Sequence, residues 1–251
     1  MLTDRYREGA YLNKVPDWHA GDSPWKADNV LRMLEKHGLA PRTVCDIGCG
    51  AGEILVELQK KMGPDIQFTG YDISPQAIAI CKPKENATLR FQECDVAKSG
   101  DKADSFDLVL LLDVFEHVPD YLGFLQSVTG RAKWFVFHIP LDLAMESMLR
   151  GSRHLMFMRE TFGHLHFFTQ ETALATLADT GYSVVNYTFT FDGEISGMGK
   201  MPVGLKAKLW HAIRSIRFLL VKLTYRINPS LAARLFKGFN LLVLTEGTKD
   251  E

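Results

Sequence analysis

The stretch VCDIGCGAGE, residues 44–53, constrains the fold of this chain more than any other. Three glycines, Gly48, Gly50 and Gly52, follow an apolar run and precede the helix-like segment 53–61. Glycine adopts backbone conformations that other residues avoid, and it lets a ligand approach the main chain closely. A strand, a glycine turn and a helix in this order predict a ligand site at the start of the helix.

Short β-rich runs alternate with helix-like stretches along most of the chain. The runs that predict strands are 43–48, 66–73, 88–96, 105–114, 133–140, 182–191 and 239–246. The stretches that predict helices between them are 53–61, 74–82, 119–128 and 169–181. The nearly continuous apolar character of the first five strands suits a parallel sheet covered on both faces. The alternation therefore predicts a doubly wound α/β fold, and 251 residues suffice for one packed core.

The spacing of the glycines argues against two common nucleotide sites. A dinucleotide fingerprint counted from Gly48 needs a third glycine where this chain has Glu53. A P-loop is excluded because no Gly-Lys-Ser/Thr sequence follows the turn. Asp46, just before the glycines, would repel a pyrophosphate and attract a cation. The turn therefore favours a ligand that carries an ammonium or sulfonium group.

Acidic residues also mark the ends of the next two predicted strands. Asp72 ends the second strand, where a carboxylate can bind both hydroxyls of a ribose. Asp95 ends the third strand, where it could accept a hydrogen bond from an adenine amino group. A helix cap explains any single acid of this kind about equally well. Three acids at successive strand ends beside the glycine turn favour a nucleoside ligand.

Four segments occur in the order of the motifs of a known family: VCDIGCGAGEIL, GYDIS, ECDV and FDLVLLLDVFEHVPD. In these segments the chain resembles class I S-adenosylmethionine-dependent methyltransferases, most closely the branch of the ubiquinone-biosynthesis O-methyltransferases. The resemblance covers residues 41–191 and resumes at NLLVLTE. It implies a Rossmann-like, mostly parallel seven-stranded sheet of order 3-2-1-4-5-7-6 whose last strand is antiparallel. It also implies S-adenosylmethionine as methyl donor and S-adenosylhomocysteine as product.

The resemblance assigns the donor-binding residues position by position. They are Asp46, Gly48, Cys49 and Gly50 at the methionine part, Asp72 and Ile73 at the ribose and adenine, Asp95 and Val96 at the adenine, and Leu112 and Asp113 beside the sulfonium. Cys49 matches a position that contacts the ligand through its backbone, so its thiol is not expected to act as a nucleophile.

The predicted organisation is one domain with two additions. The methyltransferase core comprises residues 41–192 and 238–251, with a basic helical insertion at 193–237. Residues 1–40 are expected to form an N-terminal helical lid in which Trp25 and Lys26 contact the donor. The alternative is a helix that simply docks on the edge of the core.

Methyl transfer from a sulfonium requires mainly that the acceptor be positioned, but an oxygen acceptor usually also needs a base. His138 is a candidate because it lies at the carboxyl end of the fifth predicted strand, where open α/β sheets place their sites. His164 and His166 are two residues apart and share a face of an extended segment. They could border the acceptor pocket or only cap and pack. The sequence singles out no one base.

His117 closes a D-x-x-E-H pattern that begins at Asp113. Related O-methyltransferases have a similar acidic cluster with a histidine, implicated in divalent metal binding. Their first acid is glutamate, whereas this chain has aspartate. Packing against a neighbouring loop is therefore the preferred interpretation of His117, although it remains a candidate base, and no metal is expected.

The net charge of −1 conceals a basic segment. No Asp or Glu occurs between Ile195 and Thr245, and nine Lys or Arg residues lie there. Within it, residues 204–226 have apolar residues at helical spacing, which predicts an amphipathic helix. Three interpretations stay open: a cap over the substrate, a peripheral contact with anionic lipid, and a contact with another polyanion. No RNA-reading motif is present, so no nucleic-acid partner is expected.

The charged amino terminus and the absence of an apolar run of about 18 residues predict a cytoplasmic protein, with membrane association as a possible addition. Four cysteines without CxxC spacing agree with a reducing compartment. The expected function is O-methylation of a small-molecule, glycan or lipid-linked acceptor by S-adenosylmethionine. The alternative is a non-catalytic protein that binds S-adenosylmethionine or a partner.

Overall fold

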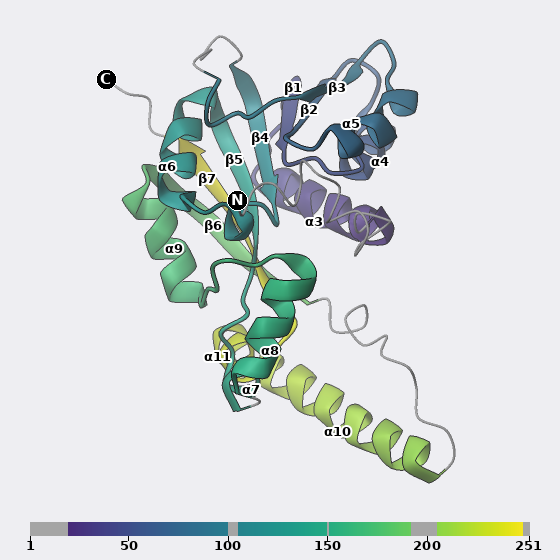
Figure 1. The fold of residues 1–251 in the computed structure, drawn as a ribbon, viewed down its shortest axis with the longest axis vertical. Helices are drawn as coiled ribbons and strands as arrows, with labels where there is room; N and C mark the ends of the chain where they lie inside the picture. Colours follow the sequence, from purple (N-terminus) through teal and green to yellow (C-terminus); the bar gives the residue numbers. More distant parts are fainter. Residues whose placement is uncertain (1–19, 100–104, 150, 192–204, 248–251) are drawn as a thin grey trace.

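A computed structural model describes residues 20–99, 105–149, 151–191 and 205–247 (Figure 1). Its centre is a seven-stranded sheet of order β3-β2-β1-β4-β5-β7-β6. The strands are β1 Thr43–Ile47, β2 Gln67–Asp72, β3 Leu89–Glu93, β4 Phe106–Leu112, β5 Ala132–Pro140, β6 Tyr182–Phe191 and β7 Phe239–Gly247. The pairs among β1 to β5 are parallel, whereas β7 runs antiparallel to both β5 and β6. The expected fold class and strand order are therefore confirmed.

Helices cover both faces of the sheet. The α-helices are α3 Ser23–Lys36, α4 Glu53–Met62, α5 Pro75–Cys81, α6 Tyr121–Val128, α7 Met145–Leu149, α8 Ser152–Phe157, α9 Gln170–Asp179, α10 Leu205–Ile227 and α11 Pro229–Leu235. Single turns of 3-10 helix lie at Ala20–Asp22, Lys82–Lys84, Phe115–His117 and Thr129–Arg131, and a π-helical turn lies at Met158–Phe162. Helices α3, α4 and α5 pack on one face and α6, α9 and α11 on the other (Figure 1).

Local sequence accounts for several of these boundaries. The Ser74 hydroxyl accepts a hydrogen bond from the Ala77 amide, and Pro75 occupies the first turn of α5. Thr169 and Thr172 form a reciprocal capping box at the start of α9. The alternation of buried side chains in the strands divides the core into one apolar cluster on each face of the sheet.

The structure differs from the sequence-based expectation in two places. The third strand ends at Glu93, so Asp95 lies in the turn after the strand and not at its end. The segment of α7, α8 and the π-helical turn, Met145–Phe162, was not expected to be helical. Its helices are short, so tertiary packing determines their geometry more than helix propensity does. Helix α7 packs on α11, and residues of α8 and of the π-helical turn line the cavity described below.

The amphipathic helix expected over 204–226 is present as α10. Residues 1–19 of the expected lid and residues 192–204 of the insertion lie outside the described residues. Among the described residues, no helix has the length and apolar character needed to cross a bilayer.

Candidate active site

A cavity of about 810 Å³ opens at the carboxyl ends of strands β1 to β5. The turns after these strands form one wall, and the first residues of α3 and of β7 complete it. Residues of α8 and the π-helical turn close the opposite side. Open α/β sheets bind ligands at this edge, where successive turns leave a crevice.

The glycine turn after β1 has the tight geometry that its sequence predicts. The amides of Gly48 and Cys49 both donate to the carbonyl of Tyr71, at 2.7 and 3.0 Å. Gly48 has a φ of 80°, and a Cβ there would lie 2.8 Å from a methyl of Val114. Gly52 has a φ of 77°, and its Cβ would lie 2.6 Å from the ring of Phe91. These two glycines are therefore required by backbone conformation and by close packing.

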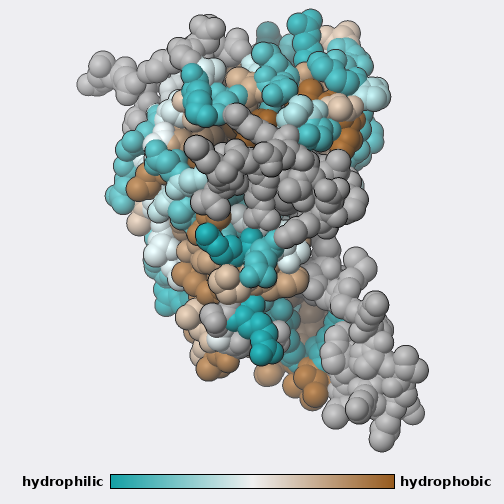
Figure 2. All heavy atoms as spheres, in the orientation of Figure 1, coloured by the Kyte–Doolittle hydropathy of each residue, from teal (hydrophilic) through white to brown (hydrophobic). Residues whose placement is uncertain are grey.

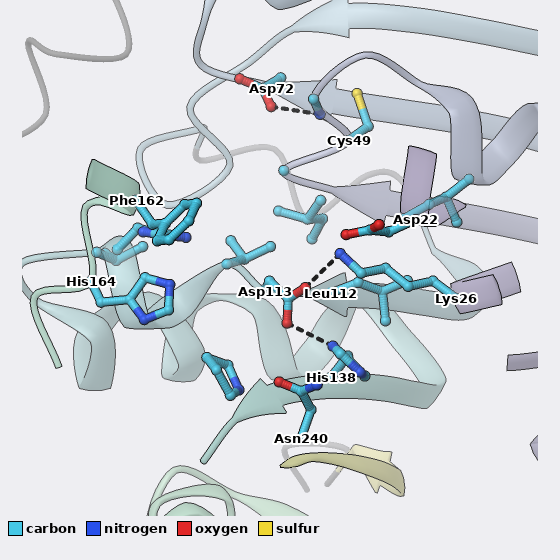
Figure 3. Close-up of a pocket in the computed structure, with 18 of the residues that line it drawn as sticks. Asp22, Lys26, Cys49, Asp72, Leu112, Asp113, His138, Phe162, His164 and Asn240 are labelled. Carbon is cyan, nitrogen blue, oxygen red and sulfur yellow. Dashed lines mark hydrogen bonds and ion pairs between the residues drawn. The ribbon is translucent and has the colours of Figure 1, made fainter. Parts of the chain in front are cut away.

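Asp72 is fixed to this turn at the wall of the cavity (Figure 3). One carboxylate oxygen accepts from the Gly50 amide at 2.9 Å and the other from the Ser74 amide at 2.8 Å. Burial raises the pKa of Asp72, and the backbone hydrogen bonds offset part of that effect. The carboxylate is therefore held in one orientation before any ligand arrives.

Asp46 lies behind the wall. It is 2% exposed and does not line the cavity. Burial and then the charge of Asp72 raise its pKa to about 7, while Lys26 acts in the opposite direction. The structure thus gives Asp46 no direct contact with the cavity, whereas the sequence-based expectation placed it beside the donor's amino group.

A chain of polar contacts crosses the floor of the cavity (Figure 3). The Lys26 amine lies 2.7 Å from one oxygen of Asp113, and the other oxygen lies 2.6 Å from Nδ1 of His138. Nε2 of His138 is 2.9 Å from the hydroxyl of Thr190. The ring of Trp25 packs edge-on against His138, with centroids 5.8 Å apart. Trp25 and Lys26 thus line the cavity from a helix that also packs its apolar face on the core.

The side chains of Lys26 and Asp113 in this series of contacts stabilise each other's charged forms. Burial alone would raise the pKa of Asp113, but His138 and Lys26 together hold it well below its usual range. Burial lowers the pKa of the Lys26 amine, yet the carboxylate of Asp113 outweighs that effect and the net shift is upward. Both ring nitrogens of His138 already have partners. His138 therefore orients Asp113 and is poorly placed to take a proton from an acceptor.

His164 has the arrangement of an oriented base. Its Nδ1 lies 2.6 Å from a carboxylate oxygen of Asp142, and both side chains are buried at the cavity wall. The segment is held in place because the amides of Leu165 and His166 donate to the carbonyl of Glu116, at 2.8 and 3.1 Å. A carboxylate at Nδ1 fixes the tautomer and leaves Nε2 as the nitrogen that can accept a proton.

The two remaining candidate histidines, His117 and His166, differ in whether they line the cavity. His166 does not line the cavity: its Nε2 lies 2.9 Å from the carbonyl of Val118, and its ring packs on Tyr121. His117 lines the cavity, and its ring meets that of His164 edge-on with centroids 5.1 Å apart. Of the four histidine candidates, three therefore face one cavity and His166 packs behind it.

Glu116, His117 and His164 form a cluster whose potential ligand atoms all lie within 4.8 Å of one another. Glu116 is fully buried, and neither of its carboxylate oxygens has a hydrogen-bond partner. Burial, and then the charge of Asp113, raise the pKa of Glu116 well above its usual range. The donor set of one carboxylate and two imidazoles suits a divalent transition metal.

The other residues expected to bind the donor line the same cavity. They are Gly48, Cys49, Gly50, Ile73, Asp95, Val96 and Leu112, together with Asp72 and Asp113. Asp142 and Thr190, the partners of His164 and His138, are site residues that the sequence did not predict. Asp142 is 22 residues from His164 and Thr190 is 52 residues from His138, so only the folded chain reveals the pairing.

Comparison with known proteins points in one direction. A family profile described as "Methyltransferase domain" matches residues 18–187. The ubiquinone biosynthesis O-methyltransferase of Haemophilus ducreyi is 32% identical over 145 residues, which are 52% of this chain and 60% of the relative. The corresponding protein of Albidiferax ferrireducens is 33% identical over 131 residues, 48% of this chain and 51% of the relative. The chain thus spans about half the length of these curated relatives.

The fold also matches solved structures. The magnesium protoporphyrin IX methyltransferase of Synechocystis, crystallised with bound S-adenosylhomocysteine, superposes with a TM-score of 0.53 at 16% identity. That match covers 89% of this chain and 83% of the other.

Proposed function

This chain belongs to the methyltransferase domain family, and we propose that it transfers a methyl group from S-adenosylmethionine to an oxygen atom of a small acceptor. Its membership supports activity as an S-adenosylmethionine-dependent methyltransferase, and with O-methyltransferases among its relatives a non-catalytic role is not favoured. The choice of oxygen draws on the O-methyltransferases among its relatives. The proposal includes a glycan or a lipid-linked molecule as the acceptor that carries this oxygen atom.

The donor would occupy the part of the cavity next to the glycine turn. Asp72 would bind the ribose hydroxyls, and Ile73, Asp95 and Val96 would surround the adenine. The main chain of the turn and the Leu112–Asp113 corner would hold the methionine end. The fixed orientation of Asp72 and the position of the glycine turn at the wall of the cavity support this placement.

The pair of His164 and Asp142 carries the catalytic part of the proposal. The bound donor supplies an activated methyl group, which is displaced in line from its sulfonium onto the acceptor oxygen. His164 would take the hydroxyl proton on Nε2 as the oxygen attacks. Asp142 would hold the ring in the required tautomer and stabilise the imidazolium that forms.

To test this assignment, His164→Gln and Asp142→Asn should be compared with His166→Gln, a histidine that does not line the cavity. Incorporation of labelled methyl from S-adenosylmethionine into fractionated cell extract measures activity. Calorimetry with S-adenosylhomocysteine measures donor-site binding. We expect the first two variants to lose roughly 10²- to 10⁴-fold in rate and to keep their affinity for S-adenosylhomocysteine. Equal activity of all three variants would remove His164 as the base.

A second mode of activation is favoured by the orphaned oxygens of Glu116. The cluster of Glu116, His117 and His164 fits a divalent ion, and Asp142 would orient His164 for it as outer carboxylates do in metal sites. Such an ion would lower the pKa of an acceptor hydroxyl. Titration with Mn²⁺ or Co²⁺ in a calorimeter, with Glu116→Gln as control, separates the two modes. Saturable binding that the variant loses supports the ion, and no binding leaves His164 as the base.

A further inference from the structure

One end of the molecule has a concentration of exposed apolar side chains, here called the apolar end. Twelve of the sixteen large apolar side chains that are exposed among the described residues lie on α7, α8, α10 and α11, and these are 42–83% exposed. They are Met145, Met148, Leu149, Met156, Phe157, Ile213, Ile216, Leu219, Leu220, Leu223, Ile227 and Leu231. Soluble monomeric proteins rarely expose such a contiguous set, which usually marks an interaction site.

The four helices lie together beyond the edge of the sheet (Figure 1). Helix α11 contacts both α10 and α7, and α7 contacts α8. Figure 2 shows hydrophobic side chains gathered toward this end of the molecule. The exposed residues therefore belong to one surface and not to scattered positions.

Helix α10 has two distinct faces. Val221 is buried, and Tyr225 stacks on Phe239 of β7 with ring centroids 5.7 Å apart. Ile216, Leu220 and Leu223 recur every three or four residues on the opposite, exposed side. This spacing is typical of a face that is buried against something. In the structure, that face is turned to solvent.

Positive charge borders the apolar stripe. Lys222 and Arg226 are exposed, and at 100° per residue they lie along one edge of the stripe on α10. No acidic residue occurs from Ile195 to Thr245. The nearby acid of α7, Glu146, is already engaged by Arg217 at 2.8 Å. An apolar face with a basic edge complements an anionic lipid surface, where the stripe enters the acyl boundary and the cations contact headgroups.

The apolar end also reaches the active-site cavity. Phe157 is 53% exposed and at the same time lines the cavity. Its neighbours His154 and Met158 line it too. The described part of α10 contributes no residue to that lining, which argues against α10 as a direct cover of the substrate.

From these observations we propose that the apolar end docks on an anionic lipid bilayer and turns the mouth of the cavity toward it. The acceptor that this arrangement fits is an amphiphile whose apolar part stays in the bilayer while its hydroxyl reaches the cavity past Phe157. The identity of the acceptor rests on the proposed methyltransferase function, whereas bilayer docking stands without it.

The test is sedimentation of the full chain with vesicles of phosphatidylcholine alone or with added phosphatidylglycerol, at low and high salt. We expect the protein to pellet with the anionic vesicles only, and less so at high salt. The double variant Ile216→Asp/Leu223→Asp should lose at least about tenfold in partitioning, because both changes place charge in the acyl boundary. Lys222→Glu/Arg226→Glu should also weaken binding, by roughly fivefold or more per site.

Leu122→Asp is the matched control, since Leu122 is a half-exposed apolar residue on α6, away from the apolar end. It should pellet like the wild type. Equal partitioning of the Ile216→Asp/Leu223→Asp variant and the wild type would overturn the proposal. So would a stable dimer in light scattering that the same variant converts to monomer, because the face would then be covered by a second copy. Calorimetry with S-adenosylhomocysteine on each sample shows separately whether the donor site is intact.

Discussion

At the scale of the residue, Asp113 combines an unusual backbone with a demanding set of partners. It is the one described non-glycine residue with a positive φ, at 57°. Aspartate tolerates this left-handed conformation better than most residues, and strain of this kind concentrates at functional sites. The conformation lets the carboxylate bridge Lys26 and His138, so the strain is offset by one ion pair and one hydrogen bond.

Removing the charge of Asp113 should destabilise the folded protein, and removing the charge of Lys26 as well should restore part of the lost stability. Asp113→Asn keeps the shape and the backbone preference but leaves the buried amine of Lys26 without its counter-charge. We expect a loss of about 3 kcal/mol in the free energy of unfolding. Lys26→Met/Asp113→Asn should recover much of it, because no unpaired charge remains. Urea unfolding of the two single variants and the double variant measures the coupling, and strict additivity would contradict the bridge.

Asp46 predicts a pH dependence whose sign follows from its raised pKa. The folded-state pKa is about 7, against 3.8 for the ordinary carboxyl. Between these values the unfolded chain releases a proton that the folded chain retains. The contribution of Asp46 to the free energy of unfolding is therefore fully present below about pH 4 and is lost as the pH rises to about 7. The loss is about 4 kcal/mol, since each pKa unit corresponds to about 1.4 kcal/mol.

The isosteric variant Asp46→Asn isolates this contribution, since both proteins share every other titrating group. Urea unfolding at several pH values between 4 and 8 should show a shallower decline for the variant than for the wild type. Parallel curves would mean that Asp46 is ionised in the folded protein at acidic pH.

At the scale of the element, α10 is attached to the rest of the molecule at few points. Arg217 makes a forked contact with Glu146 of α7 and also donates to the carbonyl of Lys237 at 2.9 Å. Both charged side chains are mostly buried, so water screens the pair less than it would a surface pair. The apolar inner face supplies the rest of the attachment.

Arg217→Ala should therefore loosen α10 without unfolding the sheet. We expect faster hydrogen exchange along α10 and a loss of about 2 kcal/mol in the free energy of unfolding, because Glu146 is left without its cation. The control is Arg234→Ala, which breaks the exposed pair with Glu171 and should cost less than about 1 kcal/mol. Equal effects of the two substitutions would show that the Arg217 contact is not an anchor.

At the scale of the whole molecule, the cavity draws its walls from distant parts of the chain. Helix α3, the turns after β1 to β5, the α8 segment and the start of β7 all contribute. A ligand that contacts several of these walls should stabilise the folded protein as a unit. At a hundred times its dissociation constant, S-adenosylhomocysteine should add about 2.7 kcal/mol.

That gain corresponds to a rise in Tm of roughly 5 to 10 °C for a chain of this size. Asp72→Ala should reduce affinity for S-adenosylhomocysteine at least about tenfold, because a charged contact is lost. The rise in Tm at the same ligand concentration should shrink accordingly. An unchanged rise in the variant would show that Asp72 does not contact the ribose.

The sequence alone determined the fold, and it predicted which edge of the sheet carries the proposed donor site. Strand and helix order, the capping residues Ser74 and Thr169, and the glycine turn are local patterns, because burial periodicity and backbone conformation act over a few residues. The ordered motifs then placed the turn and Asp72 at one edge of the sheet. The amphipathic character of α10 could also be predicted from the sequence, since it depends only on the helical spacing of apolar residues.

Only the tertiary structure decided which partners each histidine contacts. His138 meets Asp113 and Thr190, which are 25 and 52 residues away, and His164 meets Asp142 across 22 residues. Nothing local distinguishes an oriented histidine from a packed one, because its partner arrives from another strand or loop. The same holds for the exposed stripe of α10. Its spacing is the same whether it faces a core or solvent, and the packing of Val221 and Tyr225 decides which side is left uncovered.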